Sequence, residues 1–122
     1  QTDDGAYTDV TNCMMLAAIP GKVGDGAAAV AAGGTPTIKG ANATATTVRR
    51  FLVGPKDCEI TGIAMTPDRK TMFINVQHPG EDGNLTTMTS HWPASQTDAA
   101  STKRPRSATV VITRTNGGEI AV

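Results

Sequence analysis

The chain has 122 residues, and its eleven basic and eleven acidic side chains cancel to a formal net charge of zero. This balance gives no electrostatic reason to expect a nucleic acid or a membrane surface as partner, and no apolar run approaches the roughly 18 residues of a membrane-spanning helix. The polar start predicts that no signal peptide is present. One tryptophan, one tyrosine and two phenylalanines indicate a thin core for an independent domain.

The first half of the chain predicts short strands and one long loop. Residues 6–10 are β-prone, and residues 13–19 (CMMLAAI) form an apolar run of strand length. Residues 20–46 are rich in glycine, alanine and threonine, and we expect a long loop there because bulky anchoring side chains are scarce. Residues 47–53 (TVRRFLV) predict the next strand.

The most informative stretch covers residues 58–81 (CEITGIAMTPDRKTMFINVQHPGE). It predicts strands at 59–66 and 71–78, joined by a turn at 67–70 whose proline and aspartate favour chain reversal. The second strand ends in the polar group 77–81, where a purely structural strand would simply turn. The apolar residues that we expect to pack are Ile60, Ile63 and Met65 on one strand and Met72, Ile74 and Val76 on the other.

A second long loop is predicted at 79–106, with Trp92 holding it against the sheet. Residues 107–114 (SATVVITR) are a strongly β-branched strand. The Asn-Gly pair within residues 115–118 favours a hairpin turn, and residues 119–122 would begin a last strand.

These elements predict an all-β fold of antiparallel sheets, corresponding to about two blades of a β-propeller. Residues 54–122 would form one four-stranded blade with loop 79–106, and residues 6–53 a partial blade with loop 20–46. The whole chain, 1–122, would be a single partial domain and a fragment of a larger propeller, since a closed ring needs roughly four to eight blades. Such a fragment should self-associate or need the rest of the propeller.

Alternating strand directions place several polar loops on one face of this arrangement, and loops on a rigid scaffold are the usual home of functional sites. The polar residues expected to gather there are Asp9, Asn12, Asp57, Glu59, Gln77, His78, Glu81 and Asp82.

Each candidate has a functional and a structural interpretation. Glu59 begins the innermost strand and could ligate a metal or hold a ligating residue, or it could bond to neighbouring backbone. His78 could be an acid–base group or a ligand, or a satisfied structural histidine. Four arginines could bind phosphate: Arg49 or Arg50, which point to opposite faces, and Arg104 and Arg106. Glu81 could simply solvate its loop, and Asn12 could cap a turn, as Asp9 could.

Cys13 and Cys58 could form a disulfide or remain two small buried thiols. The chain has no G-x-S-x-G elbow, no P-loop, no dinucleotide fingerprint and no zinc-ligand spacing.

The string GPKDCEITGIAMTPDRKTMFINVQHPGE, then SHWP at 90–93 and RPRSATVVITRTNGGEI, resembles the C-terminal end of the PhoX-type bacterial alkaline phosphatases and their uncharacterised relatives. The resemblance implies a propeller enzyme, periplasmic or secreted, that hydrolyses phosphate esters with calcium and iron ions. It also implies that most metal ligands lie in blades absent here. This chain would add supporting residues and at most one ligand, with Glu59 the first candidate.

The sequence therefore predicts the C-terminal part of a metal-dependent phosphatase, a phosphoric ester hydrolase that is inactive alone. Its catalytic residues are not identified by any motif, and Glu59 and His78 are the candidates. The alternative is a non-catalytic β-propeller or β-sheet module for binding or assembly, in which loop 79–106 binds a protein or a surface glycan.

Overall fold

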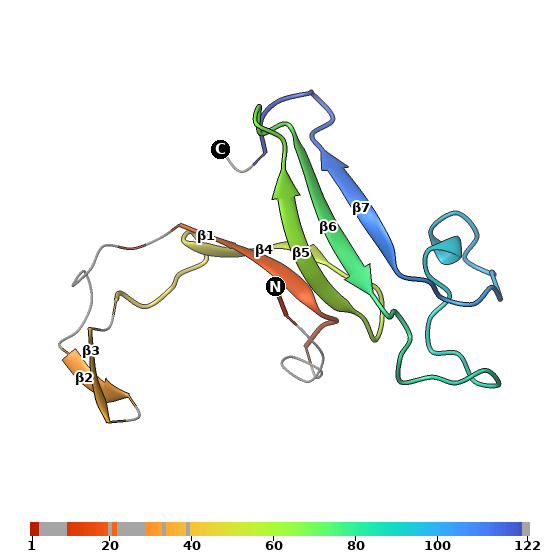
Figure 1. The fold of residues 1–122 in the computed structure, drawn as a ribbon, viewed down its shortest axis with the longest axis horizontal. Helices are drawn as coiled ribbons and strands as arrows, with labels where there is room; N and C mark the ends of the chain where they lie inside the picture. Colours follow the sequence, from red (N-terminus) through yellow and green to blue (C-terminus); the bar gives the residue numbers. More distant parts are fainter. Residues whose placement is uncertain (3–9, 20, 22–28, 33, 39, 121–122) are drawn as a thin grey trace. The chain divides into compact units, whose positions relative to one another are not determined.

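The computed structural model describes residues 1–2, 10–19, 21, 29–32, 34–38 and 40–120. These ranges contain β-strands, one short 3-10 helix and no α-helix (Figure 1), so the predicted all-β fold is confirmed. No helix in them is long and apolar enough to cross a membrane. In chain order the elements are β1 (Met14–Ala18), β2 (Ala29–Ala32), β3 (Thr35–Ile38), β4 (Val48–Val53), β5 (Glu59–Met65), β6 (Thr71–Gln77), η1 (Ala94–Gln96) and β7 (Ala108–Thr113).

The chain divides into two compact units, one of residues 16–50 and one of residues 1–15 and 51–122. In the first unit, β2 and β3 pair as an antiparallel hairpin. The prediction of a loop without strands at 20–46 is therefore wrong. Gly34 lies between the two strands with φ +80°, a conformation that glycine adopts readily and that permits a tight reversal between strands of small side chains.

β1 and β4 pair in a sheet of two strands. The strands predicted at 13–19 and 47–53 are thus confirmed, with bounds one residue shorter at most ends. The strand predicted at 6–10 lies outside the described residues except for Val10, which is in a turn.

β5, β6 and β7 form an antiparallel sheet in that order. The β5–β6 turn is the one predicted at 67–70: the Thr66 N–H donates to the Thr71 carbonyl oxygen at 2.9 Å. Arg69 has φ +55°, which explains why a glycine would suit this position. The Thr66 hydroxyl donates to a carboxylate oxygen of Asp68 at 2.6 Å and lowers the pKa of that carboxyl.

The core lies on one face of this sheet, where alternate residues of β6 point inward. Met72, Ile74 and Val76 are 3%, 2% and 4% exposed, as predicted. They pack in one cluster with Cys58, Ile60, Trp92 and Ile120.

A β-bulge changes which residues of β5 join this core. The register with β6 shifts between Thr61 and Ala64, and Gly62 takes φ +58°. Because the extra residue interrupts the alternation at this point, Ile63 is 57% exposed. Met65 stands opposite the buried Met72 and thus on the core face, but as the last residue of β5 it is 37% exposed. The prediction that both pack with Ile60 is wrong.

The last predicted strand, 119–122, is not found in its described part. The Ile120 N–H donates to the carbonyl oxygen of Arg69 at 2.8 Å, so this segment returns to the β5–β6 turn rather than pairing along β7. The Glu119 carboxylate accepts from the Arg69 guanidinium. Residues 121–122 lie outside the described residues.

Loop 79–106 is held against the sheet by Trp92, which is 9% exposed, as predicted. The backbone N–H of Arg106 donates to the Trp92 carbonyl oxygen at 3.0 Å. A ring nitrogen of His91 lies 2.9 Å from the carbonyl oxygen of Lys103. These bonds join the middle of the loop to its C-terminal end and fix the course of that half.

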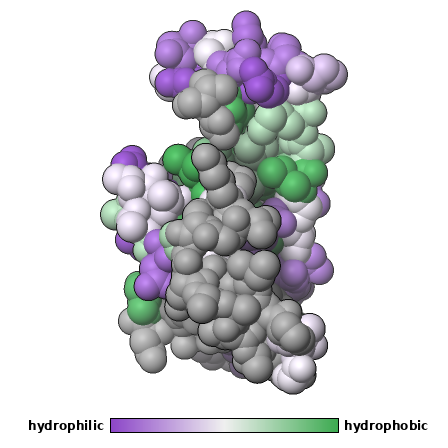
Figure 2. Space-filling view, turned by 90° about the vertical axis from the view of Figure 1, so that its left-hand side faces the viewer, coloured by the Kyte–Doolittle hydropathy of each residue, from purple (hydrophilic) through white to green (hydrophobic). Residues whose placement is uncertain are grey.

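The exposed surface carries both hydrophobic and hydrophilic side chains. On the face drawn in Figure 2, hydrophobic patches lie among hydrophilic regions. Single exposed apolar residues are normal in soluble proteins, but Leu85, at 74% exposure, is notable because it lies beside a cavity described below.

Candidate functional site

Three of the predicted polar residues meet at one end of the β5–β6 pair. Glu59 stands opposite Gln77 in the ladder, and His78 follows directly. Oε2 of Glu59 lies 3.4 Å from Nε2 of His78, and Oε2 of Glu81 lies 2.9 Å from Nδ1 of the same ring. The imidazole therefore stands between two carboxylates.

The chain turns sharply here because backbone bonds hold it. His78 has φ +34°, and its N–H donates to the Ser107 hydroxyl at 2.9 Å. The Gly80 N–H donates to the carbonyl oxygen of Asp57 at 2.7 Å. A Cβ on Gly80, at φ +78°, would lie 3.0 Å from that of Ser90, so a larger residue would be strained there. Loops from three parts of the sequence thus position His78.

The three side chains are partly open to solvent. His78, Glu59 and Glu81 expose 33%, 28% and 35% of their side chains. The Nδ1 atom is buried and, although it lies 2.9 Å from Oε2 of Glu81, makes no hydrogen bond to the described residues. When the ring is protonated, both contacts become ion pairs, so the arrangement can hold or pass a proton.

Cys58, next to Glu59 in the chain, is fully buried. Burial, followed by the nearby Cys13 and the carboxylates of Asp57 and Glu81, raises the pKa of its thiol to about 12. A thiol that stays protonated is a poor nucleophile. Of the two alternatives for the cysteines, the structure has thiols rather than a disulfide.

Asp57 lies beside this cluster through its carbonyl oxygen, which accepts from the N–H groups of Gly80 and Glu81, whereas three other predicted residues make contacts elsewhere. The Asn12 amide donates to the Gly54 carbonyl oxygen at 3.1 Å, a structural bond. Gln77 is exposed and accepts from the Thr61 hydroxyl at 3.4 Å. Arg106 lines a different hollow, of about 310 Å³, with Lys103 and Asp98 among its walls. Asp9 lies outside the described residues.

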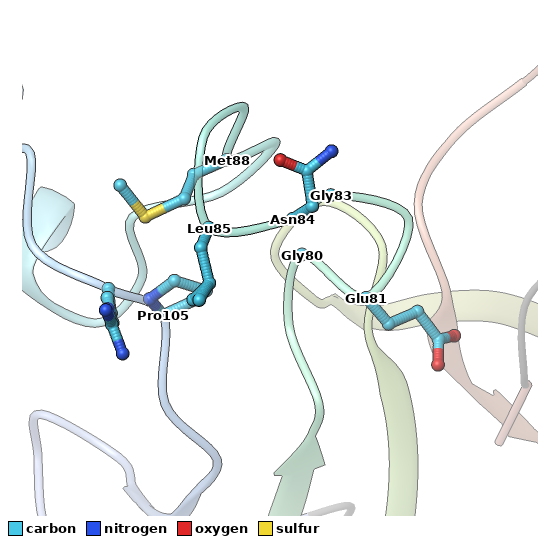
Figure 3. A pocket seen from close by; sticks show the side chains of 8 residues that line it. Gly80, Glu81, Gly83, Asn84, Leu85, Met88 and Pro105 are labelled. Carbon is cyan, nitrogen blue, oxygen red and sulfur yellow. The ribbon is translucent and has the colours of Figure 1, made fainter.

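Sequence reasoning missed a cavity of about 390 Å³ behind the turn that carries Glu81 (Figure 3). Its walls include Leu85, Met88 and Pro105, and Arg104 also lines it. The signal in the sequence was a leucine and a methionine within an otherwise polar loop.

A calcium–iron cluster would need more ligands than this site offers. In the described part of the chain, no group of three or more histidine, cysteine, aspartate or glutamate side chains is arranged to hold a metal ion. The carboxylates of Glu59 and Glu81 lie on opposite sides of the His78 imidazole, and each is close to one of its two nitrogens. Calcium takes about six to eight oxygen ligands, so these residues do not fit a complete metal centre.

Comparison with known proteins identifies the family. A family model described as "Alkaline phosphatase PhoX" matches residues 1–80, which is more than half of the chain. The chain therefore belongs to the PhoX alkaline phosphatase family.

One solved structure also matches, that of Pseudomonas fluorescens PhoX in complex with vanadate, a transition state analogue. The identity is 43%, the match covers 61% of this chain and 11% of that chain, and the TM-score is 0.49. The present chain thus spans a small part of that protein's length. No curated protein matches.

Proposed function

We propose that this chain is part of a metal-dependent phosphoric ester hydrolase and does not turn over substrate alone. Membership of the PhoX family supports the reaction class. The observation that carries the proposal is the placement of His78 between Glu59 and Glu81 at one end of the sheet. Both the small share of a relative's length and the incomplete ligand set favour a contribution to a larger site.

Within that site, His78 would move a proton. A phosphate monoester releases an alcohol oxygen that needs a proton, and a partly exposed imidazole can carry one to it. Glu59 and Glu81 would orient the ring. Calcium and iron, when bound, would polarise the phosphoryl group; we propose that Glu59 supplies at most one ligand to them from this chain.

The first test measures hydrolysis of 4-nitrophenyl phosphate by the 122-residue chain with calcium and iron supplied. We expect no turnover above a blank without protein. Clear turnover that disappears on chelation would show that the chain needs no further part.

The second test uses the longest protein that the same gene encodes. We expect His78→Gln to lower kcat about 100-fold, the range for loss of a general acid. The matched control is His91→Gln, because that ring contacts only a loop carbonyl oxygen in the described structure. Equal activity of the two variants would remove His78 from the mechanism.

A second candidate function is non-catalytic binding or assembly. It is favoured by a mostly apolar cavity of about 470 Å³, lined by the end of β4, one face of β6 and β7, and Trp92. In this case the chain would associate through apolar surface and open strand edges. Light scattering distinguishes the possibilities for the isolated chain: a monomer at high concentration would contradict self-association.

We also propose that the protein is exported to the periplasm or secreted, in line with the PhoX resemblance. Cell fractionation with an antibody against the chain tests this, and recovery with a cytoplasmic marker enzyme would contradict it.

A further inference from the structure

The cavity behind the Glu81 turn has hydrocarbon walls that water now contacts. Leu85 is 74% exposed and faces it together with Met88 and Pro105 (Figure 3). Covering such a wall with an apolar group is favourable by about 25 cal/mol per Å². The cavity volume of about 390 Å³ is in the range of small-molecule sites, roughly 300–1,000 Å³.

The same cavity carries a cation that no described residue neutralises. Arg104 lines it, and within the described ranges its guanidinium makes no ion pair or hydrogen bond. Glu81 also borders the cavity, but its carboxylate contacts the ring of His78 at 2.9 Å and points away from Leu85 and Met88 (Figure 3).

Asn84 braces the loop beside the cavity. Its side-chain oxygen accepts from the N–H groups of Thr86 and Thr87, each at 2.8 Å. The rest of the amide points away from Leu85 and Pro105 (Figure 3), so the side chain braces the loop and leaves the cavity to the apolar residues and Arg104.

The loop that forms the cavity is built in advance. The Gly83 N–H donates to the Gly80 carbonyl oxygen at 3.0 Å, and the Asn84 N–H donates to the Thr87 carbonyl oxygen at 2.9 Å. Gly83 is so closely packed that an added Cβ would lie 2.9 Å from the backbone of Thr87. A ligand would thus enter a fixed site with little ordering cost.

We infer that this cavity binds a small organic anion: an aryl or short alkyl body that carries one phosphate, phosphonate or carboxylate group. The anionic group pairs with the guanidinium of Arg104. The hydrocarbon body lies against Leu85, Met88 and Pro105. The inference does not depend on the proposed phosphatase activity, because binding here needs neither metal nor turnover.

The test is a titration of the full 122-residue chain followed by amide NMR spectra. The probes are phenylphosphonate, whose carbon–phosphorus bond resists phosphatases, benzoate, inorganic phosphate and benzyl alcohol. We expect saturable shifts at residues 80–88 and 104–105 with phenylphosphonate. Benzoate distinguishes a carboxylate from a phosphate preference. Inorganic phosphate and benzyl alcohol should each bind at least about tenfold more weakly, because each lacks one of the two contacts.

Two exposed substitutions probe the two halves of the site. Arg104→Gln should weaken phenylphosphonate binding about tenfold, as expected for loss of a charge-assisted bond, and Leu85→Ser about fivefold through lost apolar contact. The controls are Arg50→Gln and Val10→Ser, an exposed arginine and an apolar residue of 76% exposure elsewhere. The dispersed spectrum confirms folding of each variant.

Three results would overturn the inference. The first is the absence of saturable shifts at 80–88 and 104–105. The second is binding of inorganic phosphate as tight as that of phenylphosphonate, which would leave the apolar wall without a role. The third is equal weakening by the control substitutions.

Discussion

Glu59 and His78 meet because the β5–β6 ladder sets Glu59 opposite the residue before His78. They are nineteen residues apart in the sequence, yet Oε2 of Glu59 and Nε2 of His78 are 3.4 Å apart. The ladder fixes the backbone of Glu59, and the bonds of the turn fix His78 one residue beyond β6. The pair therefore depends on both the sheet and the turn, and proton transfer requires groups held at such a fixed distance.

Gly54→Ala should destabilise the protein by about 1–3 kcal/mol, the usual cost of overpacking. An added Cβ would lie 2.4 Å from the Cys58 sulfur and 2.7 Å from Cδ1 of Ile60, and both of those residues are buried. Urea unfolding gives the free energy of unfolding. Gly117→Asn is the control, because nothing lies within 4 Å of that site and asparagine tolerates its positive φ. Equal stability of Gly54→Ala and the original protein would contradict the packing described.

Ile74→Ala should lower the free energy of unfolding by about 2–5 kcal/mol. Ile74 is 2% exposed and lies in the cluster that contains Trp92. Because Trp92 is the single tryptophan, its fluorescence reports unfolding of this core directly. Val111→Thr, on the opposite face at 58% exposure, should change stability by less than about 0.5 kcal/mol. Similar losses in both variants would mean that the sheet buries the other face.

Stability should fall as the pH rises above 9, because the pKa of the Cys58 thiol is about 9 when unfolded and about 12 when folded. Below pH 9 the thiol is protonated in both states. Between 9 and 12 the unfolded state loses its proton first, so unfolding becomes easier by up to about 1.4 kcal/mol per pH unit.

Lysines and the tyrosine titrate in the same range, so the measured quantity is the difference between the original protein and Cys58→Ala. The variant should be less stable at pH 7 and should lose less stability between pH 8.5 and 10.5. Parallel curves would indicate that Cys58 is not buried as described.

Glu119→Gln should change stability by less than about 1 kcal/mol. Its partner, Arg69, is 60% exposed and Glu119 is 39% exposed, and exposed ion pairs contribute little. Ile120→Ala should cost more, because Ile120 is 4% exposed. Urea unfolding of both variants checks the order, and the reverse order would show that the C-terminal segment is held by charge rather than by burial.

The sequence allowed the strands and turns of the hairpin to be predicted because local chemistry determines them. The Pro67-Asp68 turn and the alternation of Met72, Ile74 and Val76 each depend on neighbours in the chain. The exposure of Ile63 was not predictable in this way, because an inserted residue in β5 shifts the pairing without any signal in hydrophobicity.

The candidate site also has one part that the sequence predicts and one part that it does not. Placement of Glu59 and His78 at one end of the sheet follows from strand order, which the pattern made visible. The cavity beside Leu85 depends on how loop 80–88 folds on itself through the Asn84 side chain. Such bonds join residues that a loop of polar composition does not distinguish from its solvated neighbours.

The bulge in β5 also defines where this hairpin can change length. One residue more on β5 than on β6 stands between Thr61 and Ala64. Removal of Gly62 or Ile63 would restore continuous pairing on both sides, with the inward residues before and after it still facing inward. Evolution and engineering can therefore delete a codon at this point without scrambling the core, which strand interiors seldom allow.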